Sequence, residues 1–244
     1  MSYESDLLRD WYLLFHYGSP DEILDGVGFD PSTLPPRCLE FPRTTVEAAK
    51  LAPPVERALD LGCAVGRSTF ELTRFSSEVI GIDFSASFIG VAEEIRRGNK
   101  VRYRRFREMH LAEELFVDLP GSVEPAKASF EVGDAMNLRP DLGQFDLVHA
   151  ANLLCRLPSP QLFLDRLPDL VTPGGRLVLA TPATWLEEYT PRENQPTGAT
   201  LEFLKEHLHR TFEFVESQEL PFLIREHQRK FQLSTSQTSL WIRR

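Results

Sequence analysis

The chain has 244 residues, of which 42% are hydrophobic and 26% charged, which is enough apolar material for the core of one α/β domain with additions. Its net charge of −9 argues against a general basic surface for nucleic acid, and no apolar run approaches the roughly 18 residues that indicate a membrane span. Three widely spaced cysteines predict no disulfide framework and no Cys/His pair has zinc spacing, while the N-terminus lacks a signal-peptide profile, so we expect a cytoplasmic protein without a metal.

The first predicted element is a helix over residues 4–17, where apolar side chains recur at helical spacing before Gly18 and Pro20 end it. Its second half carries groups that can stack or hydrogen-bond, namely Tyr12, Phe15, His16 and Tyr17. Two interpretations stay open. The helix either packs into the core with a satisfied histidine, or it covers a ligand site as a lid.

The central motif spans residues 57–72 and predicts a buried strand, a glycine-bounded turn and an immediate helix. Gly62 allows the sharp turn, and the helix after Gly66 directs free N–H groups back toward a ligand. The glycines are four apart, which fits neither the dinucleotide fingerprint nor the phosphate loop. The motif therefore indicates a nucleotide-type pocket for a ligand without phosphates, or else an ordinary tight turn.

Acidic side chains end the next two predicted strands. Asp83 closes the strand over residues 78–84 and either binds ribose hydroxyls or caps the following helix. Asp134 lies in a Gly-Asp-Ala sequence at the end of the strand predicted within residues 128–138. From the residues alone it can be a simple turn aspartate.

A fourth strand and its exit loop cover residues 145–157, and a Pro-Gly-Gly turn at 173–175 leads into a fifth strand. Asn152 and Arg156 follow the fourth strand at the same sheet edge, so we expect both to face a substrate. A helix over residues 200–210 then precedes two antiparallel strands, at 212–220 and 231–242.

The loop over residues 181–198 leaves the fifth strand toward the same crevice. Trp185 and Tyr189 could hold a flat substrate, and Glu187, Glu188 and Arg192 could bind the two charges of an amino acid. A surface loop of mixed charge is the equal alternative.

Other stretches are predicted to be irregular or exposed. Residues 19–43 look irregular before a short helix capped by Thr44 or Thr45. Residues 98–127 form an insertion, either a hairpin or a helical excursion, and residues 225–230 are expected to be exposed. The basic run in and before the insertion is interpreted as a solvated face: Arg96, Arg97, Arg102, Arg104, Arg105 and Arg107.

Together the acidic strand ends, the Gly62–Gly66 turn and the Pro-Gly-Gly turn resemble class I S-adenosylmethionine (SAM) methyltransferases over roughly residues 55–180. The resemblance implies one Rossmann-like α/β domain over residues 1–244, with a mostly parallel seven-stranded sheet and an antiparallel C-terminal hairpin. Its predicted parts are a helical lid segment at 1–50, a SAM-binding core at 55–190, the insertion at 98–127, and a C-terminal helix and strands at 200–244. The resemblance assigns contacts with SAM to Asp60, Gly62, Cys63, Ala64, Gly66, Asp83, Phe84, Asp134, Ala135 and Ala150.

A narrower resemblance, over nearly the whole chain, is to the 5-thiohistidine (4-mercaptohistidine) N-methyltransferases that finish ovothiol biosynthesis. It is carried by Phe15-His16-Tyr17-Gly18, Arg37-Cys38, Gly62-Cys63-Ala64-Val65-Gly66-Arg67-Ser68, Ala150-Ala151-Asn152-Leu153-Leu154-Cys155-Arg156-Leu157 and Thr184-Trp185-Leu186-Glu187-Glu188-Tyr189-Thr190-Pro191-Arg192-Glu193. The chain departs from this family at residues 195–198, where Gln-Pro-Thr-Gly stands in place of Trp-Leu-Gly-Gly.

This second resemblance implies transfer of a methyl group from SAM to an imidazole nitrogen, with S-adenosylhomocysteine (SAH) as product. Imidazole has a reference pKa of about 6.5, so it is mostly neutral at pH 7 and needs alignment more than a strong base. Candidates for catalysis are Asn152, Tyr17 and His16. Candidates for substrate binding are Tyr12, Phe15, His16, Tyr17, Asn152, Arg156, Trp185, Glu187, Tyr189 and Arg192.

The alternatives are a methyltransferase for histidine or another small molecule, and a SAM- or SAH-binding module without catalysis. An NAD-dependent oxidoreductase is disfavoured by the glycine spacing. We expect a small-molecule substrate, no nucleic-acid or membrane partner, and a monomer or homodimer.

Overall fold

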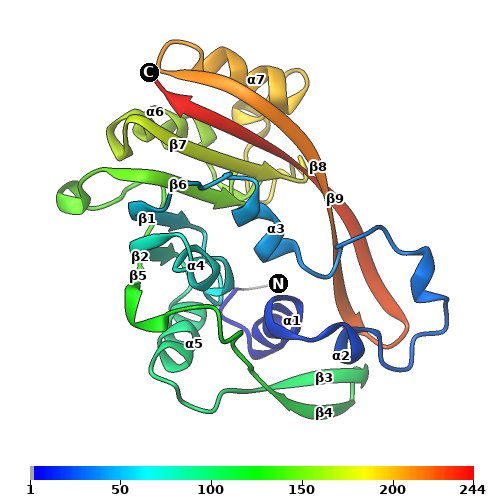
Figure 1. Ribbon diagram of the computed structural model, residues 1–244. Helices are drawn as coiled ribbons and strands as arrows, with labels where there is room; N and C mark the ends of the chain where they lie inside the picture. The colour runs from blue at the N-terminus through cyan, green and yellow to red at the C-terminus, as the bar shows by residue number, and fades with distance from the viewer. Residues whose placement is uncertain (1–2) are drawn as a thin grey trace.

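A computed structural model describes residues 3–244 and contains a seven-stranded sheet in the order β5-β2-β1-β6-β7-β9-β8 (Figure 1). Five strands run parallel, and the last two form an antiparallel hairpin on the edge beside β7. The predicted Rossmann-like sheet is therefore confirmed. Its strands are β1 (Val55–Leu61), β2 (Ser76–Asp83), β5 (Ala128–Val132), β6 (Phe145–Ala151), β7 (Val171–Thr181), β8 (Phe212–His227) and β9 (Lys230–Arg243).

Helices cover both faces of the sheet because its central strands are apolar on both sides. Leu59 and Leu61 of β1 pack in one cluster with side chains of the helices α6 and α7. Ala58 of the same strand packs on the opposite face with Val46 and Leu72 from α3 and α4. The helices in residues 3–244 are α1 (Asp6–Tyr17), α2 (Pro20–Leu24), α3 (Phe41–Glu47), α4 (Arg67–Leu72), α5 (Ala86–Arg96), α6 (Pro160–Leu170) and α7 (Thr200–Leu208).

The chain direction creates an opening beside β1. From β1 the chain moves outward to β2 and β5 on one side, while β6 and β7 lie on the other. In open α/β sheets, ligands bind at such a switch point, outside the carboxyl ends of the strands. Helix α1 lies at this end of the sheet, with the distal parts of β8 and β9 beyond it (Figure 1).

The insertion is a hairpin, which decides between the two predicted alternatives. Strands β3 (Arg102–Glu108) and β4 (Leu111–Phe116) form a separate two-stranded antiparallel sheet. The prediction of a solvated basic face is wrong for Arg105, whose exposed fraction is 7%. Its guanidinium is held inside because it pairs with Glu113 and Asp25.

The C-terminal hairpin is longer than predicted and runs from the sheet down to α2 and the β3–β4 hairpin (Figure 1). The prediction that residues 225–230 are exposed is wrong for Arg225 and Glu226, which are buried. The strands continue because Phe222 and Leu223 bury their side chains against the N-terminal segment, and the Leu223 N–H donates to the Cys38 carbonyl.

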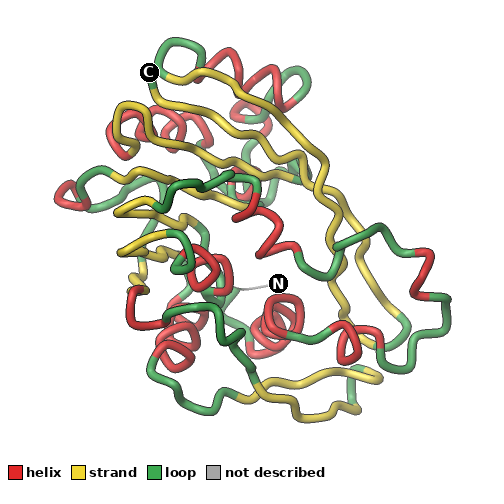
Figure 2. The backbone as a smooth tube through the Cα atoms, viewed as in Figure 1, coloured by secondary structure: helices red, strands yellow, loops and turns green. Residues whose placement is uncertain are grey.

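The stretch predicted to be irregular contains α2, which is capped by Ser19 in a capping box with Glu22. A long, mostly irregular segment then passes beside the end of the C-terminal hairpin before α3 (Figure 2). Helix α3 begins at Phe41, not at a threonine cap. Thr44 and Thr45 lie inside it, where each hydroxyl donates to the carbonyl three residues earlier.

Within residues 3–244, no helix has both the length and the apolar character needed to cross a bilayer. The same residues contain no group of three or more histidine, cysteine or carboxylate side chains arranged to hold a metal ion.

Candidate active site

A cavity of about 470 Å³ opens at the carboxyl ends of β1, β2 and β6, and α1 forms part of its wall. It collects most of the residues that the sequence predicted for the site. These are Tyr12, Phe15, His16, Asp60, Gly62, Cys63, Ala64, Asp83, Phe84, Asp134, Ala135, Asn152, Arg156 and Tyr189.

The turn after β1 requires glycine at two positions. Gly62 has φ 72° and Gly66 has φ 88°, both in the left-handed region. A Cβ on Gly66 would lie 2.8 Å from the ring of Phe130, so a larger residue would displace α5 and β5 from the turn. Gly66 does not line the cavity; it is the N-cap of α4 and thus sets the direction of that helix.

Asp83 is prepared to accept hydrogen bonds. Its two carboxylate oxygens accept from the backbone N–H groups of Ala64, at 2.8 Å, and Ser85, at 2.9 Å. Ser85, not Asp83, is the N-cap of α5, because its hydroxyl accepts from the Phe88 N–H. Burial raises the pKa of Asp83, although these two backbone bonds act in the opposite direction. Each oxygen keeps a second lone pair that can face the cavity.

Asp60 lies deeper and has an exposed fraction of 1%. Its carboxylate accepts from the Thr69 hydroxyl at 2.7 Å and from Nδ1 of His149 at 2.8 Å. Sequence reasoning missed His149. The signal that could have found it is its position on β6, directly opposite Asp60 in the parallel register.

The far end of the cavity has an open aromatic face. Phe84 is 77% exposed, which is unusual for a phenylalanine unless something covers it. Asp134 lies nearby in the lining and accepts from the Met136 N–H at 2.9 Å. Ala150 is buried in β6 and does not line the cavity, whereas its neighbour Ala151 does.

The other half of the cavity is bounded by α1, α3 and the C-terminal hairpin. Tyr12, Phe15 and His16 line it from α1, and Phe41 and Ile224 line it from the other two elements. The sequence prediction missed these last two because only the tertiary fold brings them to the strand ends. Tyr3 was also missed. Its ring makes edge contacts with Tyr12 and Phe88, which places the start of the described chain in the cavity wall.

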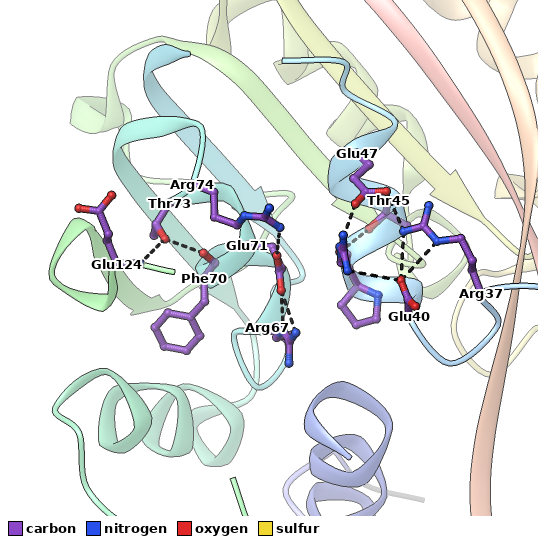
Figure 3. Close-up of polar contacts among 12 residues, drawn as sticks. Arg37, Glu40, Thr45, Glu47, Arg67, Phe70, Glu71, Thr73, Arg74 and Glu124 are labelled. Carbon is purple, nitrogen blue, oxygen red and sulfur yellow. Dashed lines mark hydrogen bonds and ion pairs between the residues drawn. The ribbon is translucent and has the colours of Figure 1, made fainter. Parts of the chain in front are cut away.

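His16 has a buried Nδ1 atom without a hydrogen-bond partner among the described residues. Burial, followed by the charge of Arg67, lowers its pKa to about 3. Arg67 is fixed beside it by two bonds to the buried carboxylate of Glu71, at 2.8 and 3.0 Å (Figure 3). The imidazole is therefore neutral at pH 7.

Tyr17 does not line this cavity. Its hydroxyl donates to the Val65 carbonyl at 2.7 Å, and burial raises its pKa well above the usual value. The bond fastens the end of α1 to the turn that carries Gly62 and Gly66.

Asn152 and Arg156 lie between the two halves. Asn152 has φ 57°, and its Oδ1 accepts from the buried Ser236 hydroxyl, so its amide N–H groups remain for a ligand. Arg156 donates to the Thr184 carbonyl at 3.0 Å and lies 4.7 Å from the centre of the Tyr189 ring. Within residues 3–244, Arg156 forms no ion pair with a carboxylate.

The side chains of the loop after β7 have different surroundings. Tyr189 reaches the cavity, but Trp185 packs on the core instead, and its indole N–H donates to the Thr200 hydroxyl at 3.0 Å. The side chains of Glu187 and Arg192 are 67% and 85% exposed, lie 3.7 Å apart, and do not line the cavity.

Solved structures support the fold assignment. The N-methyltransferase NodS from Bradyrhizobium japonicum, in complex with SAH, superposes with a TM-score of 0.59 and 17% identity, over 98% of this chain and 99% of that one. Magnesium protoporphyrin IX methyltransferase from Synechocystis, with bound SAM, gives a TM-score of 0.53 and 16% identity, over 100% of this chain and 98% of that one.

Curated sequences are similar over part of their length. Tocopherol O-methyltransferase from Arabidopsis thaliana is 28% identical over an aligned region that covers 52% of this chain and 30% of that protein. A ubiquinone biosynthesis O-methyltransferase from Dechloromonas aromatica is 28% identical over an aligned region that covers 52% of this chain and 44% of that protein. The chain thus spans less than half the length of both. The model of a family described as a methyltransferase domain matches residues 36–234, so the chain belongs to this family and contains a class I SAM-dependent methyltransferase domain.

Proposed function

We propose that this enzyme methylates a ring nitrogen of 5-thiohistidine, which would complete ovothiol biosynthesis. The observation that carries the proposal is Arg156, a guanidinium without a carboxylate partner in residues 3–244, at a cavity whose walls are otherwise largely aromatic and apolar. A flat ring with an amino-acid tail matches this combination. The sequence resemblance to the 5-thiohistidine N-methyltransferases supports it independently.

The residues around the turn after β1 fit SAM. The free lone pairs of Asp83 suit two ribose hydroxyls, and the exposed face of Phe84 suits stacking with adenine. We assign the adenine amino group to Asp134, and the methionine end to the deeper part, where Asp60, Cys63 and Ala64 line the cavity. When bound there, SAM supplies a methyl group made electrophilic by its sulfonium.

The acceptor ring would lie between α1 and the loop after β6. His16 is neutral, so its ring can lie against the acceptor without repelling a cationic ligand. The Asn152 amide, oriented by Ser236, can donate to the thiolate or to a ring nitrogen. Holding the acceptor nitrogen in line in this way supplies much of the rate, since alignment alone can contribute several kcal/mol.

Arg156 would take the substrate carboxylate, because a guanidinium fork matches two carboxylate oxygens. Thr184 and Tyr189 already restrain it from behind, so little side-chain freedom remains to be lost on binding. In this assignment Glu187, Trp185 and Arg192 shape the outer loop and do not touch the reacting groups.

A phenolic acceptor is the second candidate, since the similar curated proteins are named as O-methyltransferases. The cavity of about 470 Å³ lies in the lower part of the range of roughly 300–1,000 Å³ for ligand sites, and it must hold both SAM and the acceptor. That volume favours a small acceptor. We further propose that the enzyme works in the cytoplasm as a monomer or homodimer, without a nucleic-acid or membrane partner, consistent with three free, buried cysteines.

The test is mass spectrometry of the purified enzyme with SAM and, in parallel, 5-thiohistidine, histidine and a simple catechol. A singly methylated product from 5-thiohistidine alone is expected. Arg156→Gln should then raise KM for the acceptor about tenfold or more, as expected for a lost charge-assisted bond, while Arg192→Gln leaves it unchanged. Methylation of the catechol, with none of 5-thiohistidine, would replace the proposal.

A further inference from the structure

The central strand of the sheet carries a carboxylate whose two neighbours in the sheet are a glycine and a histidine. Asp60 on β1 pairs in parallel register with Gly81 on β2 and with His149 on β6. The side chain of His149 is fully buried, and that of Asp60 is 2% exposed. Nδ1 of His149 lies 2.8 Å from Oδ1 of Asp60, so the neighbouring strand holds one of the two carboxylate oxygens.

The second carboxylate oxygen is held from a helix. Thr69 of α4 donates a hydrogen bond from its hydroxyl to Oδ2 of Asp60 at 2.7 Å. Gly81 leaves room for this hydroxyl, because a Cβ at that position would lie 2.6 Å from the Thr69 oxygen. The carboxylate is therefore fixed in one orientation by two partners that come from different elements.

The protonation state of the His149 ring follows from its second nitrogen. Nε2 is buried and has no hydrogen-bond partner among the described residues. A neutral ring with its proton on Nδ1 leaves only a lone pair at Nε2, whereas a protonated ring would bury a charged donor without an acceptor, which costs more. We therefore assign one proton to Nδ1, donated to Asp60, and the negative charge of the pair to the carboxylate.

This negative charge has no cationic side chain to match it. Within residues 3–244, Asp60 forms no ion pair with a lysine or an arginine. Asp60 lines the cavity together with Cys63 and Asp83. Burial raises the pKa of Cys63 most, and the charges of Asp83 and Asp60 raise it further, so the charge of Asp60 acts on groups of the cavity wall. The deep end of the cavity is therefore suited to a positive group of a ligand.

We propose that His149 is a positioning residue for SAM, which acts through Asp60 on the ammonium group at the methionine end. Its neutral ring fixes the carboxylate and adds no positive charge that would cancel the attraction between carboxylate and ammonium. This role rests on the assignment of the methionine end to the deep part of the cavity under the proposed function. It requires no particular acceptor.

Calorimetry with two ligands tests this role in the full chain. SAH carries the ammonium group, whereas 5′-methylthioadenosine keeps the adenosine and the sulfur but lacks the amino-acid group. His149→Leu removes the donor and should weaken SAH binding about tenfold, while 5′-methylthioadenosine binding changes by less than about twofold. His149→Asn carries an amide nitrogen one bond from Cγ, as histidine carries Nδ1, and should recover most of the SAH affinity. Equal losses for both ligands, unchanged SAH affinity in His149→Leu, or no recovery in His149→Asn overturns the proposal.

A matched pair of threonines keeps the role testable if the leucine variant does not fold. Thr69→Val removes the other bond to Asp60 and should weaken binding of SAH alone, by about threefold to tenfold. Thr73 is equally buried at the end of the same helix, where its hydroxyl bonds the Phe70 carbonyl and the Glu124 N–H (Figure 3). Thr73→Val should leave both affinities unchanged. Unaltered SAH affinity in Thr69→Val, or an equal loss in Thr73→Val, contradicts the role of the oriented carboxylate.

Asp60→Asn separates a failure of this role from a failure of the SAM assignment beneath it. The amide keeps the shape but loses the charge, so SAH binding should fall about tenfold or more while 5′-methylthioadenosine binding stays the same. SAH binding that tolerates Asp60→Asn would move the methionine end elsewhere and overturn both. SAH binding that responds to Asp60→Asn but not to His149→Leu would reject the role of His149 alone.

Discussion

Asp83 shows how one residue can favour ligand binding at the expense of stability. Its carboxylate is partly buried and its pKa is raised, so ionisation in the unliganded protein is less favourable than in water. For a carboxyl whose pKa is raised by folding, the stabilising contribution is present below the unfolded value of about 3.9 and is lost as pH rises through the folded value. At neutral pH, Asp83 therefore costs stability.

We predict that Asp83→Asn weakens SAH binding about tenfold or more without raising the unfolding midpoint of the unliganded enzyme. The gain from removing the charge is offset because the amide nitrogen would face one of the two backbone N–H groups that the carboxylate accepts. The amide keeps the shape but loses two charge-assisted bonds to the ribose. Calorimetry measures the dissociation constant, and thermal unfolding the stability. Asp141→Asn, at a 79% exposed side chain, is the control and should change neither. Unaltered SAH affinity would remove Asp83 from the ribose site.

Asn152 combines a backbone and a side-chain requirement, which two substitutions separate. Its φ of 57° suits glycine, so Asn152→Gly should leave the backbone unstrained and lose only the stability of the bond from the buried Ser236 hydroxyl, while turnover falls about a hundredfold through the lost amide. Asn152→Ala should lose the same turnover and also about 1 kcal/mol of stability. SAH affinity should be preserved in both. Turnover that survives in the glycine variant would show that the amide has no part in the reaction.

His16 predicts a specific pH dependence of stability. A histidine whose pKa falls from about 6.5 to about 3 on folding opposes protonation of the native state, so stability declines as pH drops through this interval. His16→Gln should flatten the urea midpoint between pH 6.5 and 4 relative to the unmodified enzyme. His207→Gln, at an exposed position on α7, should leave the slope as it is. An unchanged slope in His16→Gln would mean that other groups dominate acid unfolding.

The residues that sequence reasoning placed in the cavity share a local rule. Asp60 and Asp83 lie at the carboxyl ends of β1 and β2, and Asn152 directly follows β6. Such strand ends can be predicted from apolar runs. Trp185 and Arg192 have no such anchor. The path of their loop depends on the Trp185–Thr200 bond and on packing against α7, neither of which is visible in the local sequence.

At the scale of elements, α1 is fastened at both ends to the turns that we assign to SAM. Tyr17 bonds the Val65 carbonyl, Arg67 donates to the His16 carbonyl at 3.3 Å, and Ser85 donates to the Tyr3 carbonyl at 3.2 Å. These bonds tie the helix to the loops on either side of the ligand. Opening of α1 and release of SAM or SAH should therefore be coupled.

The coupling predicts selective protection from trypsin. SAH at ten times its dissociation constant should slow cleavage after Arg9 on α1 about tenfold, since only the ligand-free state opens. Cleavage after Arg192, in the exposed loop, should proceed at its original rate. Peptide mapping by mass spectrometry follows both sites. Equal protection at both would indicate global stabilisation instead of a closing helix.

The edges of elements were harder to predict than their existence. Four of the seven residues of β3 are arginines, and the end of β8 is Arg-Glu-His, so both segments were predicted to be exposed. Arg105 and Arg225 are buried because two hairpins, about 120 residues apart in sequence, pack against α2. Local sequence patterns carry no information about this tertiary contact.

At the scale of the whole molecule, one long strand serves two purposes. The first part of β8 completes the sheet, where Phe214 packs 5.0 Å from Trp241, and its second part forms the acceptor wall. There Phe222 lies 4.8 Å from Phe41 and 5.9 Å from Phe15, which both line the cavity. Sheet stability and acceptor binding therefore depend on different ends of the same element.

Matched substitutions at the two ends of β8 test this division. Phe222→Leu and Phe214→Leu should each cost about 1–2 kcal/mol of stability, because each removes aromatic packing. Only Phe222→Leu should raise KM for the acceptor, by about fivefold, since the wall formed by Phe15 and Phe41 loses its support. SAH affinity should stay constant in both, because neither side chain lines the SAM half. A similar rise in KM from Phe214→Leu would mean that the strand transmits strain along its length and that the two ends are not independent.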